Sequence, residues 1–176
     1  MKATGIVRRI DDLGRVVIPK EIRRTMRIRE GDPLEIYTNQ GEVIFKKYSA
    51  VGEMSGMASQ YAEALGPNIS LPVLICDRDH CIAAAGISKK TVLEKSISTD
   101  LESIMEERRL VNFGSNQTLP ALDGFERGIC VVAPIVTAGD ISGAVVLVSS
   151  ENGTAATDSD VMLASVAANF LGSIIE

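Results

Sequence analysis

The chain has 176 residues, with 18 Lys and Arg against 23 Asp and Glu, and a formal net charge of −5. No stretch approaches about 18 uninterrupted apolar residues, so no membrane span is expected. The beginning of the chain lacks the apolar core of a secretory signal. Its three cysteines have no paired spacing, which favours a reducing cytoplasm. We therefore expect a cytoplasmic protein.

The charge is divided unequally along the chain. Residues 1–48 contain 11 basic and 7 acidic side chains, a net charge of +4. Residues 49–176 contain the other 7 basic and 16 acidic side chains, a net charge of −9. Blocks of opposite charge indicate two modules with different partners, which we place at residues 1–50 and 51–176. The basic module is suited to a polyanion.

The first module is predicted to contain two strand pairs around one helix. Residues 5–10 and 15–18 are rich in β-branched side chains and flank a turn. Pro19 suits the first position of a helix, which we expect to run to about residue 28. Residues 34–38 and 42–47 alternate between apolar and polar side chains, as the two strands of a hairpin do.

So small a module is not expected to be stable as a single chain. Domains of about 48 residues bury little apolar surface and usually need a disulfide, a metal or a partner chain. Residues 1–48 contain no cysteine and no histidine. Oligomerisation is the remaining option, so we predict an intertwined dimer.

The run Gly14-Arg15-Val16-Val17-Ile18-Pro19-Lys20-Glu21-Ile22-Arg23 resembles the core motif of AbrB-like, swapped-hairpin transcription regulators. The resemblance covers roughly residues 3–47. It implies that two chains exchange hairpins to build one dimeric β-barrel, that the arginines face double-stranded DNA, and that gene control is of the sporulation type. The DNA-binding residues it implies are Arg8, Arg15, Arg23 and Arg24, followed by Arg9 and Lys20, with Lys2 a weaker candidate.

Elementary chemistry supports this assignment, since arginine binds phosphate oxygens and guanine edges in a bidentate manner. The alternative is a solvated charged face. For Arg27 and Arg29 a structural role is equally expected, because cations near a helix end complement its dipole. Antitoxins use a similar barrel followed by a short, disordered tail, whereas more than 120 globular-looking residues follow the barrel motif here.

The second module is predicted to be a mixed domain of helices and hairpins. Residues 51–65 carry apolar side chains at spacings of three and four, the pattern of a coiled-coil seam. Hairpins are expected within residues 71–86 and 128–149, with a helix over 99–109 between them. A capping sequence at residue 157 precedes a final helix over 158–175. This order resembles GAF-like sensor domains, so the whole chain is predicted to belong to the α+β class.

The final helix is apolar on nearly every side, which indicates that two of its sides are buried. One side can cover the sheet of its own chain. The other side, together with the seam at residues 51–65, predicts a helical bundle between chains. Added to the dimeric first module, this second interface predicts a homotetramer. The alternative is that both apolar stripes lie inside one monomer core.

No cofactor, metal site or catalytic group is predicted. The cluster Cys76, Asp77, His80 and Cys81 lacks the ligand spacing of zinc sites, and no nucleophile motif is present, so we do not expect an enzyme. The sequence leaves open whether the second module binds a small-molecule effector. We would seek it in the loop region 110–127, which includes Asn112, Phe113, Ser115, Asn116 and Gln117.

The sequence therefore predicts a cytoplasmic, nucleoid-associated transcription regulator, an activator or a repressor, that binds double-stranded DNA. The alternative is a small-molecule sensor or interaction scaffold of the antitoxin kind, whose basic module docks an acidic protein.

Overall fold

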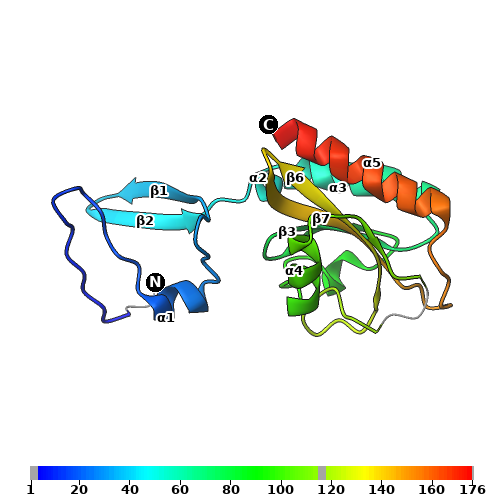
Figure 1. Ribbon diagram of the computed structural model, residues 1–176, viewed down its shortest axis with the longest axis horizontal. Helices are drawn as coiled ribbons and strands as arrows, with labels where there is room; N and C mark the ends of the chain where they lie inside the picture. Colours follow the sequence, from blue (N-terminus) through cyan, green and yellow to red (C-terminus); the bar gives the residue numbers. More distant parts are fainter. Residues whose placement is uncertain (1–3, 115–117, 176) are drawn as a thin grey trace. The chain divides into compact units, whose positions relative to one another are not determined.

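The structure is a computed structural model that describes residues 4–114 and 118–175. The chain divides into two compact units, Met1–Tyr48 and Ser49–Glu176 (Figure 1). We refer to them as the head and the body and describe each by itself.

The head contains one short helix and one hairpin, which are α1 (Lys20–Thr25), β1 (Leu34–Asn39) and β2 (Glu42–Lys47). The two strands pair in antiparallel register, and the pair Asn39 and Glu42 closes the hairpin. The two residues between them, Gln40 and Gly41, have φ angles of 29° and 90°. Positive φ at both loop positions matches the twist of the strands. The predicted second hairpin is confirmed.

Helix α1 ends three residues earlier than predicted, because the backbone turns left-handed at Arg27, where φ is 50°. The backbone N–H of Ile28 then donates to the Arg23 carbonyl at 2.7 Å, which closes the helix end. Lys47 Nζ donates to the Arg27 carbonyl at 2.9 Å and so attaches the end of β2 to this turn.

The two strands predicted at residues 5–10 and 15–18 are wrong for the single chain, since the structure assigns no strand to either segment. The turn between them is present: the Asp11 N–H donates to the Arg15 carbonyl and the Gly14 N–H to the Asp11 carbonyl, both at 3.0 Å. A strand exists only through its ladder partner, and within one chain these segments do not pair beyond the turn.

The head has almost no core of its own. Among its described residues, 4–48, Pro19 alone is buried. Its large apolar side chains lie largely on the surface. The exposed ones are Ile6, Val7, Ile10, Leu13, Val16, Val17, Met26, Ile36, Tyr37, Val43, Ile44, Phe45 and Tyr48. A unit with this surface gains little from the hydrophobic effect unless another surface covers it.

The body is built on a five-stranded antiparallel sheet. Its strands lie in the order β4-β3-β7-β6-β5, and every neighbouring pair is antiparallel. Their bounds are β3 (Val73–Asp77), β4 (Cys81–Ala85), β5 (Val111–Asn112), β6 (Ile129–Thr137) and β7 (Asp140–Val148).

Helices cover both faces of this sheet (Figure 1). Alternate strand residues point to opposite faces, so Val73 and Ile75 join one apolar cluster while Leu74 and Cys76 join the other. Helices α2 (Ala50–Glu53), α3 (Ser55–Leu65) and α5 (Asp158–Ile175) cover the first face, and α4 (Thr99–Glu106) covers the second. Two short 3₁₀ turns are η1 (Gly66–Asn68) and η2 (Lys89–Thr91). The predicted α+β class is confirmed, with an antiparallel sheet flanked by helices.

The helix predicted over residues 51–65 is interrupted at Met54, which separates α2 from α3. Its predicted seam also faces a different partner than expected. Val51, Ala58 and Leu65 are buried in the cluster between α3 and the body's own sheet. A helical spacing identifies an apolar side but not the surface that covers it, so this stripe belongs at least in part to the monomer core.

Helix α5 presents one apolar side inward and another outward. Ala164, Ala168 and Leu171 are buried against the sheet, whereas Val166 and Phe170 remain 52% and 42% exposed. At Gly172 the helix backbone approaches β6 so closely that an added Cβ would lie 2.6 Å from the Val136 carbonyl oxygen. By length and apolar composition alone, α5 also meets the requirement for a membrane-spanning helix, a test that core helices of soluble proteins pass too.

The beginning of α5 is attached to the segment before β3 by one buried carboxylate, Asp160, which is 2% exposed. Its oxygens accept hydrogen bonds from the backbone and hydroxyl of Ser70 at 2.9 and 2.6 Å and from those of Thr157 at 2.9 and 2.8 Å. Thr157 Oγ1 accepts in return from the Asp160 N–H at 3.2 Å, which completes the predicted cap. Burial raises the pKa of Asp160, but these hydrogen bonds outweigh burial and lower the pKa below its ordinary value.

Replacing Asp160 with Ala should lower the free energy of unfolding by about 2–3 kcal/mol at pH 7, because donors of Ser70 and Thr157 lose their acceptor. Since the folded-state pKa is lowered, the carboxylate's contribution is complete above about pH 4 and is lost as the pH falls through the folded-state value. Urea unfolding followed by circular dichroism should show the difference from wild type shrinking between pH 7 and pH 3. The control is Asp158→Asn, an exposed carboxylate in the same helical turn, with an expected cost of about 0.3–1 kcal/mol. Equal differences at both pH values would contradict the assignment.

Candidate functional site

Three of the cationic candidates lie on one side of α1. Lys20, Arg23 and Arg24 are spaced by three and four residues, which places them within about 100° of the helix circumference. All three are exposed. Ile22, on the opposite side of the helix, is half-buried. Met26, on the same side as Ile22, is 49% exposed, so the apolar side of this helix is only partly covered within one chain.

The other described candidates lie on the segment before α1. Arg8 and Arg9 precede the turn at residues 11–14 and Arg15 follows it, and all three are exposed. Lys2 lies outside the described residues. The structure thus presents six exposed cations on two elements of the head.

Asp11 organises the turn that carries Arg15. Its Oδ1 accepts the backbone N–H groups of Leu13 at 3.1 Å and of Arg15 at 2.7 Å. Its Oδ2 accepts the Nε–H of the Arg15 guanidinium at 2.8 Å. The hydrogen bond from the Arg15 backbone, followed by that from its side chain, lowers the pKa of Asp11 below its ordinary value, so this carboxylate is charged at neutral pH. The sequence predicted a turn between residues 10 and 15, but the contact between Asp11 and Arg15 was missed.

Arg27 and Arg29 belong to the corner between α1 and β1. Arg27 occupies the left-handed position described above, and its carbonyl accepts from Lys47. The Arg29 backbone N–H donates to Asp32 Oδ2 at 2.8 Å, and the Asp32 carboxylate lies 3.8 Å from Lys47 Nζ with only 4% of its side chain exposed. These contacts favour the structural alternative for both arginines.

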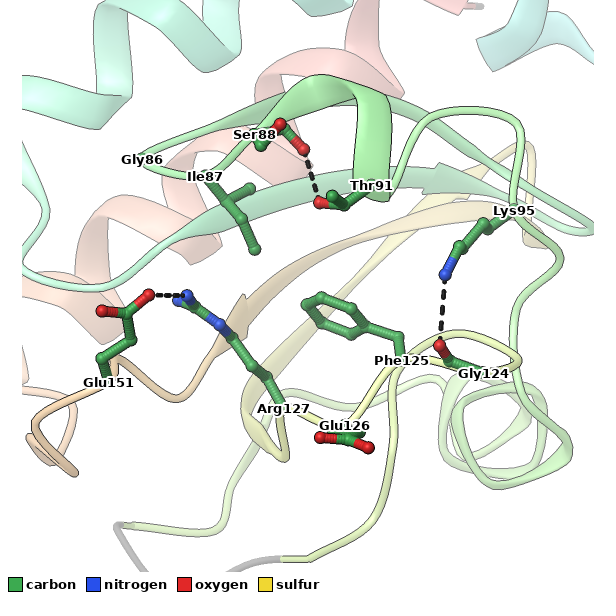
Figure 2. A pocket seen from close by; sticks show the side chains of 10 residues that line it. All are labelled: Gly86, Ile87, Ser88, Thr91, Lys95, Gly124, Phe125, Glu126, Arg127 and Glu151. Atoms are coloured by element: carbon green, nitrogen blue, oxygen red, sulfur yellow. Dashed lines mark hydrogen bonds and ion pairs between the residues drawn. The ribbon is translucent and has the colours of Figure 1, made fainter.

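The body contains a cleft of about 750 Å³ beside the edge strand β4 (Figure 2). Its lining residues come from the segment after β4, the loop before β6 and the segment after β7: Gly86, Ile87, Ser88, Thr91, Lys95, Gly124, Phe125, Glu126, Arg127 and Glu151. Ile87 and Phe125 project toward its centre, with Arg127 and Lys95 on either side. Arg127 pairs with Glu151 at 2.7 Å, and Lys95 Nζ donates to the Gly124 carbonyl at 3.1 Å.

Residues 124–127 of this cleft fall within the loop region predicted to hold an effector. Asn112 and Phe113 of that prediction are not among the lining residues, and Ser115, Asn116 and Gln117 lie outside the described residues. Sequence reasoning missed Ile87, Lys95 and Glu151, because the segments after β4 and after β7 are far apart in the sequence and only the fold brings them together.

The cysteine and histidine cluster is accounted for by the strand pair β3–β4. Cys76 and Cys81 are direct cross-strand partners and both are buried. A hydrogen bond with Cys81 and burial raise the pKa of the Cys76 thiol well above its ordinary value, which disfavours the reactive thiolate. Asp77 Oδ1 accepts the N–H groups of Asp79 and His80, both at 2.7 Å, and so forms the turn. Within residues 4–114 and 118–175, no group of three or more His, Cys, Asp or Glu is placed to hold a metal ion.

Comparison with known proteins identifies the family. The family model described as "stage V sporulation protein T C-terminal, transcription factor" matches residues 53–176, which is most of the chain. The chain belongs to the stage V sporulation protein T family of transcription factors. A second model, described as "antidote-toxin recognition MazE, bacterial antitoxin", matches residues 7–51.

Relatives of known name agree with this membership. Stage V sporulation protein T of Bacillus subtilis is 54% identical over 154 residues, which cover 86% of each chain. Transition state regulatory protein AbrB of the same organism is 62% identical over 48 residues, 27% of this chain and 50% of AbrB. The solution structure of the N-domain of the transcription factor AbrB covers 27% of this chain and 92% of that domain, with 62% identity and a TM-score of 0.26. The sequence matches to stage V sporulation protein T and to AbrB confirm the predicted AbrB-like head of a sporulation-type regulator.

Proposed function

We propose that the head binds double-stranded DNA as an intertwined dimer and that the body joins two such dimers into a tetramer. The proposed DNA-binding dimer rests on one observation, which is that the head exposes both its candidate cations and its apolar side chains. Its six described candidate cations are exposed, but so are most of its large apolar side chains, and among the described residues 4–48 only Pro19 is buried. Covering the apolar surface with a second head would create a core and would place two sets of arginines on one molecule.

The residues we propose to contact DNA are Arg8, Arg9, Arg15, Lys20, Arg23 and Arg24, with Lys2 as a weaker candidate. Six exposed cations per head give up to twelve in a dimer. Cations in this number neutralise phosphates and release counterions, which makes binding strongly dependent on salt. The body has a net charge of −9 and is repelled by DNA, so contact is confined to the heads. We place this regulator in the cytoplasm, at the nucleoid, and assign it no catalytic activity.

Arg→Ala at positions 8, 15, 23 and 24 should each weaken DNA binding, because each change removes two cationic contacts per dimer. The slope of log affinity against log salt concentration should fall in magnitude by up to about 2 for a phosphate-contacting arginine. Mobility shifts with random-sequence duplex between 50 and 200 mM salt measure both quantities. The matched control is Arg109→Ala in the body, an exposed arginine paired with Glu107 at 2.6 Å. Wild-type affinity and slope in all four head variants would refute the assignment.

A second candidate function rests on the antitoxin family match over residues 7–51. In it the head docks an acidic protein rather than a nucleic acid. The same mobility shifts separate the two functions, because an acidic-protein scaffold would bind no duplex even at 50 mM salt.

The outward side of α5 supports the tetramer. Its exposed apolar residues recur every four positions, at Met162, Val166, Phe170 and Ile174. Tyr61 of α3 stacks on Phe170 with ring centroids 5.0 Å apart and an interplanar angle of 16°. A contiguous apolar stripe across two adjacent helices is typical of a surface that another copy covers.

The double variant Val166→Asp, Phe170→Asp should convert a tetramer into a dimer, because the buried charges would have no partners at that interface. Sedimentation velocity at micromolar concentration provides the measurement, and circular dichroism checks that the body remains folded. Asn152→Asp, in an exposed loop, adds a charge without touching the stripe and should leave the tetramer intact. A wild-type protein that sediments as a dimer would argue against the second interface.

We further propose that the cleft beside β4 binds a small effector with an apolar body and one carboxylate. Ile87 and Phe125 offer apolar surface, and the Arg127 guanidinium lies at the rim. The Glu151 partner of Arg127 has 84% of its side chain exposed. Such surface pairs contribute at most about 1 kcal/mol, so a ligand carboxylate can replace Glu151 at small cost.

Phenylacetate and 4-methylpentanoate are suitable probes of this site. Millimolar concentrations of either should raise the melting temperature of the wild-type protein, because a ligand that binds the folded state stabilises it by mass action. Arg127→Gln should abolish the rise, whereas Arg109→Gln should preserve it. An equal rise with the uncharged analogue phenylacetamide would contradict carboxylate recognition, and no rise with either carboxylate would rule out this ligand class.

A further inference from the structure

Arg15 differs from the other cations on its segment because its guanidinium already forms an ion pair with Asp11. The Nε–H points to Asp11 Oδ2 at 2.8 Å while 71% of the Arg15 side chain remains exposed. A guanidinium has five N–H donors, one on Nε and four on the two terminal nitrogens. With Nε engaged, the end of the group that carries the terminal nitrogens remains available to a ligand.

That free end is suited to base recognition. Two parallel N–H donors match the O6 and N7 acceptors of guanine in the major groove. An unrestrained arginine side chain loses rotamer entropy on binding, and a side chain that is ordered beforehand loses less. The backbone of the same turn is fixed by Asp11 as well, through the N–H groups of Leu13 and Arg15. One carboxylate therefore restrains both the backbone and the side chain of Arg15.

The charge of Asp11 acts in the opposite direction on phosphate. Its side chain is 38% exposed, so it would lie close to the DNA backbone whenever Arg15 does. A carboxylate near phosphate is repelled, and the repulsion applies to every DNA sequence alike. An arginine beside such a group gains less from a phosphate than from a guanine edge.

We propose that Asp11 is the positioning residue that sets the DNA-sequence specificity of Arg15. By holding the Nε edge, it directs the terminal nitrogens to a base, and by its charge it weakens binding to phosphates alone. This inference rests on the proposed DNA binding by the head and assigns a discriminating role to an acidic residue within a basic surface.

Asp12 offers a matched control. It is exposed, it neighbours Asp11, and its carboxylate takes no part in the hydrogen bonds of the turn, all of which lie within the described residues 11–15. Asp11→Asn and Asp12→Asn change the net charge equally. Asparagine at position 11 can still accept the backbone N–H groups through its amide oxygen, so the turn is retained while the ionic restraint on Arg15 is removed.

The test compares the full-length wild type, Asp11→Asn and Asp12→Asn on two probes: a duplex selected by the wild-type protein from a random pool, and poly(dA-dT), which has no guanine and so lacks the O6 and N7 acceptor pair. In Asp12→Asn both affinities should rise together, and their ratio should stay within about twofold of wild type. In Asp11→Asn the poly(dA-dT) affinity should rise, and the specificity ratio should fall about tenfold, which is the value of one good base contact.

Arg15→Ala separates positioning from a structural role. If Asp11 acts through Arg15, adding Asp11→Asn to Arg15→Ala should leave the ratio of the single Arg15→Ala variant unchanged. A further fall in the double variant, or an unchanged ratio in Asp11→Asn alone, would overturn the proposal while leaving DNA binding by the head intact. Failure of the wild-type protein to select any duplex would instead overturn the proposed function, and this inference with it.

Discussion

The feature on which the rest of the molecule depends is the missing core of the head. Among residues 4–48 only Pro19 is buried, and strands β1 and β2 expose apolar side chains on both faces. The hydrophobic effect cannot stabilise such a unit until a second surface covers it. The geometry of the exposed arginines is therefore linked to association, because the same event that would create the core would also place the cations.

The body, in contrast, covers its apolar surface within one chain. Its sheet is covered on both faces, and two separate apolar clusters fill the space between sheet and helices. The fold of the body therefore does not depend on the head for its stability. Its negative charge complements this independence, because an acidic unit is repelled by the polyanion to which the basic head is suited.

Local signals predicted the elements that depend on neighbouring residues. The β1–β2 hairpin follows from its turn residues and α5 from its capping sequence at Thr157. Elements that depend on distant partners were predicted less well. The β-rich run at residues 5–10 has the composition of a strand but no ladder in one chain, and the stripe containing Ala58 faces the body's own sheet. The candidate site was also predicted only in part. Motif and charge indicated the arginines of the head. Neither shows where a side chain points, so the contact between Asp11 and Arg15 became visible only in the structure.

The close approach at Gly172 has a consequence for the energetics of association. Because the α5 backbone itself rests on the Val136 carbonyl, no flexible side chain separates helix and sheet at this point. The outward stripe is therefore carried on a surface with little freedom to shift. Rigid surfaces lose less conformational entropy when they meet than loosely held ones. In the proposed tetramer, more of the free energy of covering Val166 and Phe170 would therefore be available to hold two molecules together.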